Sequence, residues 1–153
     1  MIRPLKATDY RKVKWLFNEV FDESEDGNFV AAWRRRDLEA SLGLWIGSGS
    51  GFGTQCDRLV AAAIVCGTAT PSATLEFIFV DERCRGSGYG SQLLAAVLAV
   101  RPALHLTPVN DESVIRWYES QGFRFSSCKG ERKIYVRHTY NLRSRETDAV
   151  LQT

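Results

Sequence analysis

A glycine-rich segment near the middle of the chain holds the residues whose types and spacing best suit ligand chemistry. Residues 83–90 are Arg-Cys-Arg-Gly-Ser-Gly-Tyr-Gly, and they separate an apolar run that ends at Val80 from a helical pattern that begins near Ser91. Glycine lets the backbone approach a ligand closely, and N–H groups at a helix start point outward with the positive end of the helix dipole behind them. A plain strand-to-helix turn needs fewer glycines. The segment therefore predicts a cradle for an anion that carries phosphate.

Two other phosphate-binding loops do not fit the sequence that follows. Residues 86–90 resemble the glycine loop of protein kinases, but that loop joins two strands and precedes a lysine-bearing strand and a His-Arg-Asp segment. Here a helical pattern follows, and neither later element occurs. A Walker loop would end in Gly-Lys-Ser or Gly-Lys-Thr, which the chain lacks.

The composition indicates a globular chain and excludes several function classes. The 153 residues are 44% hydrophobic and 25% charged, with a formal net charge of +2, which is too small to indicate nucleic-acid or membrane binding. No apolar stretch approaches the roughly 18–20 residues of a membrane span, and the start lacks the apolar core of a signal peptide. We therefore expect an intracellular, cytoplasmic protein with one domain over residues 1–140 and a polar, frayed tail over 141–153.

The cysteines do not indicate a metal or redox site. Cys56, Cys66, Cys84 and Cys128 are widely spaced, with no Cys-x-x-Cys pair, so we expect no metal and mostly buried or idle thiols. Cys84 differs from the others, because two arginines flank it and a helix begins nearby. That setting would favour its thiolate form.

The apolar periodicity predicts an ordered series of strands and helices. The first half of the chain is expected to form a strand at 1–5, a helix from Thr8 or Asp9 to about 21, and a helix over about 29–40. A hairpin of 52–56 and 59–66, with its turn at 57–58, and a strand at 73–80 follow. The second half is expected to form a helix from about 91 that stops before Pro102, a strand at 104–107, a helix capped by Asn110 or Asp111 with Gly122 at its end, and strands near 123–127 and 132–139. No strand start is assigned within residues 42–53, where a flexible loop is expected. Consecutive strands favour antiparallel pairing, and the strand–helix–strand unit favours a parallel pair. The fold class is α/β (α+β): a mixed, mostly antiparallel sheet of about six to seven strands with about four helices on its faces.

Two segments together resemble the GNAT superfamily of N-acetyltransferases, which transfer the acetyl group of acetyl-coenzyme A to an amine. The loop contains the family's Arg/Gln-x-x-Gly-x-Gly/Ala pattern as Arg85, Gly88 and Gly90. Asn110, followed by Trp-Tyr-Glu-Ser-Gln-Gly-Phe at 117–123, is similar to the family's Asn…Tyr-Glu-x-x-Gly-Phe stretch. The resemblance extends over about residues 1–138 and implies a GNAT-like fold.

The resemblance implies acetyl-coenzyme A as the cosubstrate. In the family, amides of the loop hold the pyrophosphate, which here would involve the backbone of 85–91 with the side chains of Arg83 and Arg85 adding charge. A backbone amide of Phe79 or Val80 would polarise the thioester carbonyl. The residues implied to bind coenzyme A are Phe79, Val80, Arg83, Arg85, Gly86, Ser87, Gly88, Tyr89, Gly90, Ser91 and Asn110.

Three of the matched positions have a second interpretation or depart from the family. Asn110 touches the pantetheine or an ordered water in relatives, but it can also cap the following helix. Glu82 stands where many relatives have proline, and Ser87 stands where a basic residue is frequent. Neither change removes a backbone donor. They bear on the rigidity of the loop entry and the strength of the phosphate contacts, which Arg83 would partly offset.

Two residues are candidates for proton transfer. Tyr118 matches the family's general acid, which donates a proton to the departing thiolate, although an aromatic residue at helical spacing is often only part of a core. Glu76 is the candidate base, on a strand whose Leu75, Phe77 and Phe79 are expected on one face and whose other face is otherwise apolar. Burial there would favour a carboxyl group that accepts a proton. A sheet-edge glutamate or one paired with an arginine is the alternative.

The resemblance implies an N-acetyltransferase in which a bound amine attacks acetyl-coenzyme A directly within a ternary complex. A catalytically silent acyl-coenzyme A-binding module and a nucleotide-binding protein remain alternatives. The expected partner is an amine-bearing acceptor, with no nucleic acid and no membrane, and the chain is expected to be a monomer or homodimer. In the family, the first two helices shape the acceptor side, so the acidic residues among 22–26 would attract a cationic amine or would only face solvent. Trp33, Trp45 and Tyr135 would line an acceptor pocket or belong to the core.

Overall fold

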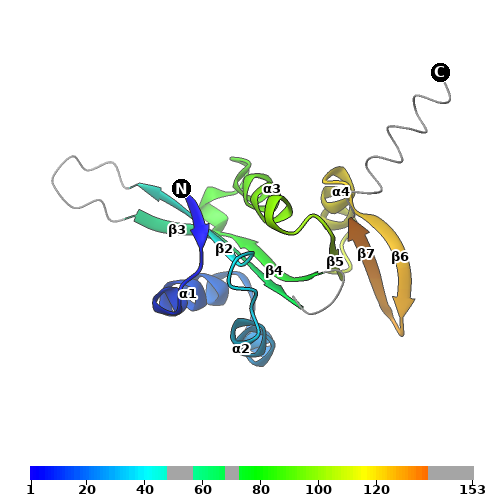
Figure 1. The fold of residues 1–153 in the computed structure, drawn as a ribbon, viewed down its shortest axis with the longest axis horizontal. Coiled ribbons are helices and arrows are strands. Elements are labelled where there is room, and N and C mark those ends of the chain that lie inside the picture. The colour runs from blue at the N-terminus through cyan, green and yellow to red at the C-terminus, as the bar shows by residue number, and fades with distance from the viewer. Residues whose placement is uncertain (48–56, 68–72, 138–153) are drawn as a thin grey trace, which may run out of the picture.

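The computed structural model describes residues 1–47, 57–67 and 73–137, and these form one seven-stranded sheet with helices on both faces (Figure 1). The strands, in sheet order, are β1 (Ile2–Pro4), β2 (Leu42–Gly47), β3 (Asp57–Cys66), β4 (Ala73–Val80), β5 (Leu104–Leu106), β7 (Arg132–Arg137) and β6 (Arg124–Lys129). The α-helices are α1 (Tyr10–Val20), α2 (Asp26–Arg34), α3 (Tyr89–Val100) and α4 (Glu112–Ser120). Short 3-10 helices cover Ala7–Asp9, Glu23–Glu25 and Glu82–Cys84.

The predicted fold class is confirmed. Neighbouring strands are antiparallel except β4 and β5, whose parallel register joins Ala73 to Leu104 and Thr74 to His105. A crossover helix permits this parallel pair, and α3 is that helix, as the strand–helix–strand pattern indicated. Beyond Thr74, β4 continues to Val80 while β5 pairs with β7 on its other side. β4 and β5 are therefore paired over only a short stretch in the middle of the sheet.

The two faces of the sheet bury different helices. Figure 1 shows α1 and α2 on one face and α3 on the other. Phe17 and Phe29 dominate the core beneath α1 and α2, and Leu93, Leu94 and Val97 bring α3 into the core of the opposite face. β3 is buried on both faces, which explains why its sequence is a continuous apolar run rather than an alternating one.

The predicted second helix is wrong at both ends. α2 begins three residues earlier than expected, at Asp26, and stops at Arg34 instead of continuing to residue 40. The chain then turns at Asp37, whose N–H donates to the Val65 carbonyl at 2.7 Å and whose carboxylate accepts from the N–H groups of Glu39 and Ala40. Because these hydrogen bonds already satisfy backbone groups in the turn, the chain gains no extra hydrogen bonds by continuing α2.

The predicted hairpin is also wrong. Residues 57–58 belong to β3 rather than to a turn, and β3 pairs with β2, which lies where no strand was assigned. Residues 52–56 lie outside the described residues. Gly43 shows why β2 has glycine within a strand: a Cβ there would lie 2.6 Å from the Trp45 ring and 2.8 Å from Leu5 Cδ2. The close approach of these side chains requires glycine.

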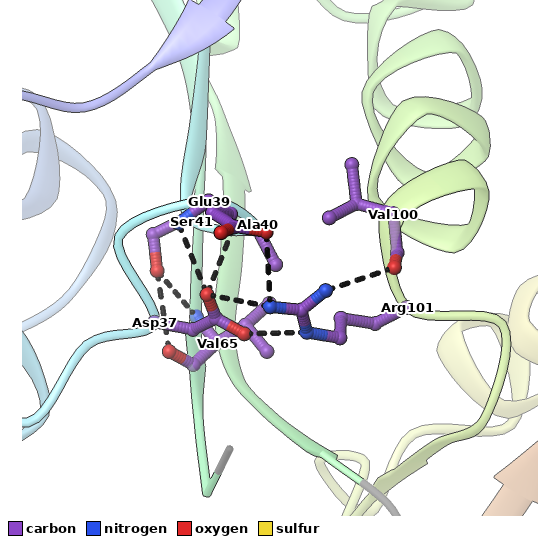
Figure 2. Close-up of polar contacts among 7 residues, drawn as sticks. All are labelled: Asp37, Glu39, Ala40, Ser41, Val65, Val100 and Arg101. Carbon is purple, nitrogen blue, oxygen red and sulfur yellow. Dashed lines mark hydrogen bonds and ion pairs between the residues drawn. The ribbon is translucent and has the colours of Figure 1, made fainter.

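An ion pair between a buried carboxylate and a partly exposed arginine connects the turn after α2 to the C-terminal end of α3 (Figure 2). Arg101 donates from Nε to Asp37 Oδ2 at 2.7 Å and from Nη2 to Asp37 Oδ1 at 3.2 Å. Ser41 adds to the same network, because its hydroxyl donates to the Val65 carbonyl and accepts from the Val65 N–H. The Asp37–Arg101 pair thus joins elements that cover opposite faces of the sheet.

Candidate active site

The loop after β4 is held by a buried carboxylate at its entry. Asp81 caps the 3-10 turn Glu82–Cys84 by accepting from the Arg83 N–H at 3.0 Å, and it also binds the Arg83 guanidinium at 2.9 Å. The pKa of Asp81 is lowered, chiefly by the hydrogen bond from the Arg83 side chain. The Asp81 N–H donates to the Val60 carbonyl, so the loop entry is bonded to β3. A charged, paired Asp81 therefore orients the chain before the glycines.

The glycines bring the backbone into the first turn of α3. Gly86 and Gly88 have φ angles of 86° and 78°, in the left-handed region, and Gly88 is the N-cap of α3. The Gln92 N–H donates to the Gly88 carbonyl, which makes it the first bond of the helix ladder. The preceding N–H groups of the first turn lie before that ladder and are available to an anion.

A cavity of about 530 Å³ opens beside this first turn. It brings together most of the sequence-predicted site: Phe79, Val80, Arg85, Gly86, Gly88, Tyr89, Gly90, Ser91 and Tyr118 all line it. The cavity thus joins the end of β4, the glycine loop, the start of α3 and one side chain of α4. Such an arrangement places an anion-binding end and an apolar wall in one space.

Arg83, Ser87 and Asn110 are not among the cavity-lining residues. The Arg83 side chain is directed to Asp81 and lines a separate cavity of about 350 Å³ with Trp15 and Glu19. Asn110 is exposed, and the helix cap is the neighbouring Asp111, whose carboxylate accepts from the Ser113 N–H at 2.8 Å. Of the two predicted caps, Asp111 is therefore the one observed.

Tyr118 presents a neutral phenol to the cavity. Its ring is buried on α4, in edge contact with Phe123 at 5.6 Å and with Trp117 at 4.9 Å between centroids. Burial raises the pKa of Tyr118 to about 12, because the phenolate would lose its hydration. At neutral pH the group keeps its proton and can act as a hydrogen-bond donor or acid. The core packing and the cavity position are both observed for this residue.

Glu76 lies on a bulge of β4, and its expected surroundings are wrong. The register pairs Ile64 with Phe77 and Val65 with Leu75, so Glu76 is an extra residue on β4. The bulge reverses the alternation, because Leu75 packs in the core beneath α3 whereas Phe77 packs with the core beneath α1 and α2. Glu76 itself is exposed and is not among the cavity-lining residues.

Several lining residues were not predicted from the sequence. These are Val20, Ile78, Cys84, Ser113, Val114 and Trp117. Trp117 could have been predicted to line the cavity because it is next to Tyr118 in the sequence. Val20 could not, because only tertiary packing brings α1 to the cavity. Cys84 is buried and its Sγ accepts from Arg58 Nη2 at 3.1 Å. Trp33, Trp45 and Tyr135 are buried in the two cores, which confirms their structural interpretation.

The described helices and side chains give two further findings. Within the described residues, no helix has the length and apolar character needed to cross a membrane. Across those same residues, no group of three or more His, Cys, Asp or Glu side chains has the arrangement of a metal site.

Solved structures share this fold over nearly the whole chain. The ribosomal-protein-S18-alanine N-acetyltransferase from Escherichia coli is 22% identical, with a TM-score of 0.64 over 89% of this chain and 90% of that chain. Arabidopsis thaliana Naa50, in complex with the bisubstrate analogue CoA-Ac-MVNAL, is 18% identical, with a TM-score of 0.60 over 89% and 95%. Arabidopsis thaliana NAA60, in complex with acetyl-CoA, is 14% identical, with a TM-score of 0.66 over 90% and 96%. At these identities the likeness establishes the fold.

Sequence comparison identifies the family. No curated protein sequence gives a significant match to the chain. A family model described as an acetyltransferase (GNAT) domain matches residues 48–125, which is about half of the chain and includes β3, β4, the glycine loop, α3, β5 and α4. With the matching fold and the loop, the chain belongs to the GNAT family of acetyltransferases.

Proposed function

We propose that this protein is an acetyl-coenzyme A-dependent N-acetyltransferase that transfers the acetyl group to a primary amine by direct attack in a ternary complex. The observation that carries the proposal is the cavity in which the first turn of α3 and the Tyr118 side chain face one space. An anion cradle and a neutral acid are the two groups that a thioester of coenzyme A requires at its opposite ends. We assign the activity to a single domain over residues 1–140.

At the phosphate end, the backbone from Arg85 to Ser91 would hold the pyrophosphate. The left-handed glycines leave this backbone without side-chain cover: a Cβ added at Gly86 or Gly88 meets no protein atom within 4 Å. Arg85 is half-exposed beside the loop and only 4.0 Å from Glu82, a distance that leaves its guanidinium available to a phosphate oxygen. Arg83 contributes through the Asp81 turn rather than by lining the cavity.

At the thioester end, the amine nitrogen attacks the acetyl carbonyl carbon, and collapse of the tetrahedral intermediate breaks the C–S bond. The sulfur leaves with the bonding electron pair and takes the proton of the Tyr118 hydroxyl. The attacking nitrogen loses its proton to a base, for which Glu76 acting through water is our candidate, since its side chain is exposed at the bulge. A backbone N–H of Phe79 or Val80, both lining the cavity, would stabilise the oxyanion.

On the acceptor side, the chain between α1 and α2 is acidic. The 3-10 helix Glu23–Glu25 carries two carboxylates, and Asp22 caps it by accepting from the Ser24 N–H at 2.9 Å. An ammonium group would be attracted to this segment before it loses its proton. The peptide-bearing analogue bound to Naa50 favours a peptide or protein amine among the acceptors to test.

Ligand binding is the first test. Acetyl-coenzyme A should raise the melting temperature of the protein, and ATP should not, because ATP lacks the pantetheine that would fill the apolar part of the cavity. Stabilisation by ATP alone would instead support the nucleotide-binding alternative and would exclude our proposal.

Turnover is the second test. Free thiol released from acetyl-coenzyme A is measured with a panel of peptide, lysine and polyamine amines, with thiol release in the absence of amine as the background. An enzyme releases thiol above that background with at least one amine. Binding without such release from any amine would support the silent acyl-coenzyme A-binding module.

A further inference from the structure

β6 forms one end of the seven-stranded sheet, and its outer edge is open. Among the described residues β6 pairs with β7 alone, so one row of its backbone N–H and C=O groups has no strand partner there. Every β6 residue after Arg124 is exposed. Figure 1 shows the β6–β7 hairpin extending away from the four helices. The edge is therefore accessible to an added strand.

The hairpin is strongly basic. Residues 124–137 contain five basic side chains and one acidic side chain, which is a formal net charge of +4 in a chain whose total is only +2. Two of the five donate to backbone carbonyls at the end of α4, namely Arg124 and Arg137. The other three are exposed near the tip and form no ion pair or side-chain hydrogen bond with any described residue: Lys129, Arg132 and Lys133.

The tip places two of these charges opposite each other. Lys129 and Arg132 are a cross-strand pair on either side of the turn at 130–131, so their side chains lie on one face of the hairpin. Like charges in such a pair are destabilising. Lys133 lies on the other face, because successive residues of a strand alternate. The tip therefore carries positive charge on both faces, and an anionic partner would stabilise it.

An exposed aromatic side chain lies near the other end of β6. Phe125 is 54% exposed, and its ring meets the Tyr135 ring edge-on at 5.8 Å between centroids. A bulge at Ser126 separates Phe125 from the basic tip. Lys129 is four residues beyond Phe125, or about 13 Å along an extended strand. β6 thus has an apolar end, a basic end and an open row of backbone groups between them.

These features match an extended peptide that carries an apolar side chain at one end and acidic side chains at the other. We propose that β6 is the docking strand for such an acidic segment of a partner protein, which adds to the sheet edge with its apolar side chain over Phe125. Main-chain hydrogen bonds would supply affinity, and the side chains would supply selectivity. Successive acidic residues alternate between faces, so they reach Lys129 on one face and Lys133 on the other. The inference goes beyond the proposed function and does not depend on it.

The same features disfavour two other occupants. A second copy of this chain would bring one basic edge against another, and the like charges would oppose pairing. A nucleic acid would be attracted to the tip, but its backbone cannot continue the peptide hydrogen-bond ladder along β6. An acidic peptide satisfies both the charges and the backbone groups.

Fluorescence anisotropy with synthetic peptides tests the docking site. The probe is a labelled Thr-Val-Thr-Glu-Asp-Glu-Asp peptide, and its matched control has Gln and Asn in place of Glu and Asp. At about 0.15 M salt, the protein should bind the acidic peptide at least about tenfold more tightly than the control. A version with every backbone amide N-methylated keeps the charges but cannot donate to a strand. It should bind at least about tenfold more weakly than the probe.

Variants of the protein locate the site. The tip variant combines three substitutions and should weaken binding of the acidic peptide by about tenfold: Lys129→Gln, Arg132→Gln and Lys133→Gln. Phe125→Ser should weaken it by about threefold. The matched control removes three exposed charges from α1 and α2 and should leave binding within about twofold of the wild type: Arg11→Gln, Lys12→Gln and Arg34→Gln. The tip variant should melt no lower than the wild type, because it loses a like-charge pair, so its weaker binding would not reflect unfolding.

The outcomes are distinct. Absence of binding to the acidic peptide, or equal losses in the tip and control variants, would overturn the inference. Equal binding of the N-methylated peptide would exclude strand addition. Tighter binding of a single-stranded RNA of the same net charge would assign the surface to nucleic acid instead. These measurements contain no coenzyme A, so the proposed function stands or fails separately.

Discussion

At the level of single residues, the proposed chemistry depends on the buried phenol of Tyr118, which lines the cavity. Its hydroxyl belongs to a ring packed against Phe123, and the raised pKa, about 12, keeps it protonated across the physiological range. In the proposed reaction, so weak an acid would donate its proton only as negative charge develops on the sulfur. Its contribution should therefore appear in turnover rather than in ground-state binding.

Tyr118→Phe should lower kcat by about 100-fold, because the variant keeps the packing and loses the proton donor. The KM for acetyl-coenzyme A should stay within about twofold of the wild type. Steady-state thiol release with the best acceptor measures both constants. Tyr135→Phe, a second buried tyrosine outside the cavity lining, is the control. An unchanged kcat in Tyr118→Phe would exclude the general-acid role.

Gly88→Ala tests the left-handed cap of the cradle. An alanine with the φ of 78° found at Gly88 costs about 1–2 kcal/mol of stability, and its methyl group would add bulk in the space beside the backbone that is proposed to hold the pyrophosphate. We expect the dissociation constant for acetyl-coenzyme A to rise by about tenfold or more.

The matched control for that variant is Gly130→Ala. Gly130 has a φ of 67° in the turn between β6 and β7, so alanine there brings similar strain at a distance from the cavity. Urea unfolding should show comparable losses in the two variants, and only Gly88→Ala should lose affinity. Equal affinity losses would mean that the cradle geometry is not specific to Gly88.

Among the elements, those with local signals were the predictable ones. β4, the glycine loop and the Asp111-capped α4 follow from contiguous residues, and all three are observed. The helix predicted over about 29–40 continues past the true end of α2 because Asp37, in the turn that follows, binds an arginine 64 residues away, a contact that local sequence does not show. The bulge at Glu76 likewise depends on the register with β3, which one strand's sequence does not encode.

The Asp37–Arg101 connection gives a prediction at this scale. Arg101→Ala should destabilise the protein by about 3 kcal/mol, because it leaves a buried carboxylate without its cation. Arg116→Ala removes an exposed pair with Glu112 on α4 and should cost less than about 0.5 kcal/mol. Chemical denaturation of the two variants measures the difference. Equal losses would show that the network in Figure 2 contributes no more to the free energy of unfolding than an exposed ion pair does.

For the whole molecule, two buried groups predict a loss of stability at alkaline pH. Burial raises the pKa of the Cys66 thiol from 9.0 to about 11 and that of Tyr118 from 10.0 to about 12. Both groups hold their protons more tightly in the folded state, so their contribution is fully present below the unfolded pKa and is lost as pH rises through the folded pKa. Stability should therefore fall between about pH 9 and 12.

The share of Tyr118 in that fall can be isolated. A shift of two pKa units corresponds to about 2–3 kcal/mol, so the wild type should lose that much more than Tyr118→Phe between about pH 10 and 12. Urea unfolding at a series of pH values measures the two curves. Parallel curves over this range would contradict a desolvated phenol at residue 118.

The short parallel register of β4 and β5 has a consequence for how the molecule opens. Two residue pairs form that register, Ala73 with Leu104 and Thr74 with His105, whereas β3 pairs with both of its neighbours over most of its length. Amide hydrogens of β5, β6 and β7 should exchange with solvent through partial opening at free energies below that of global unfolding, and those of β3 only through global unfolding. A cosubstrate in contact with both β4 and α4 would bridge the two parts and slow exchange in the C-terminal strands. The cavity beside α3 would then also be the boundary between two units of unequal stability, and its occupancy would determine whether they open together or separately.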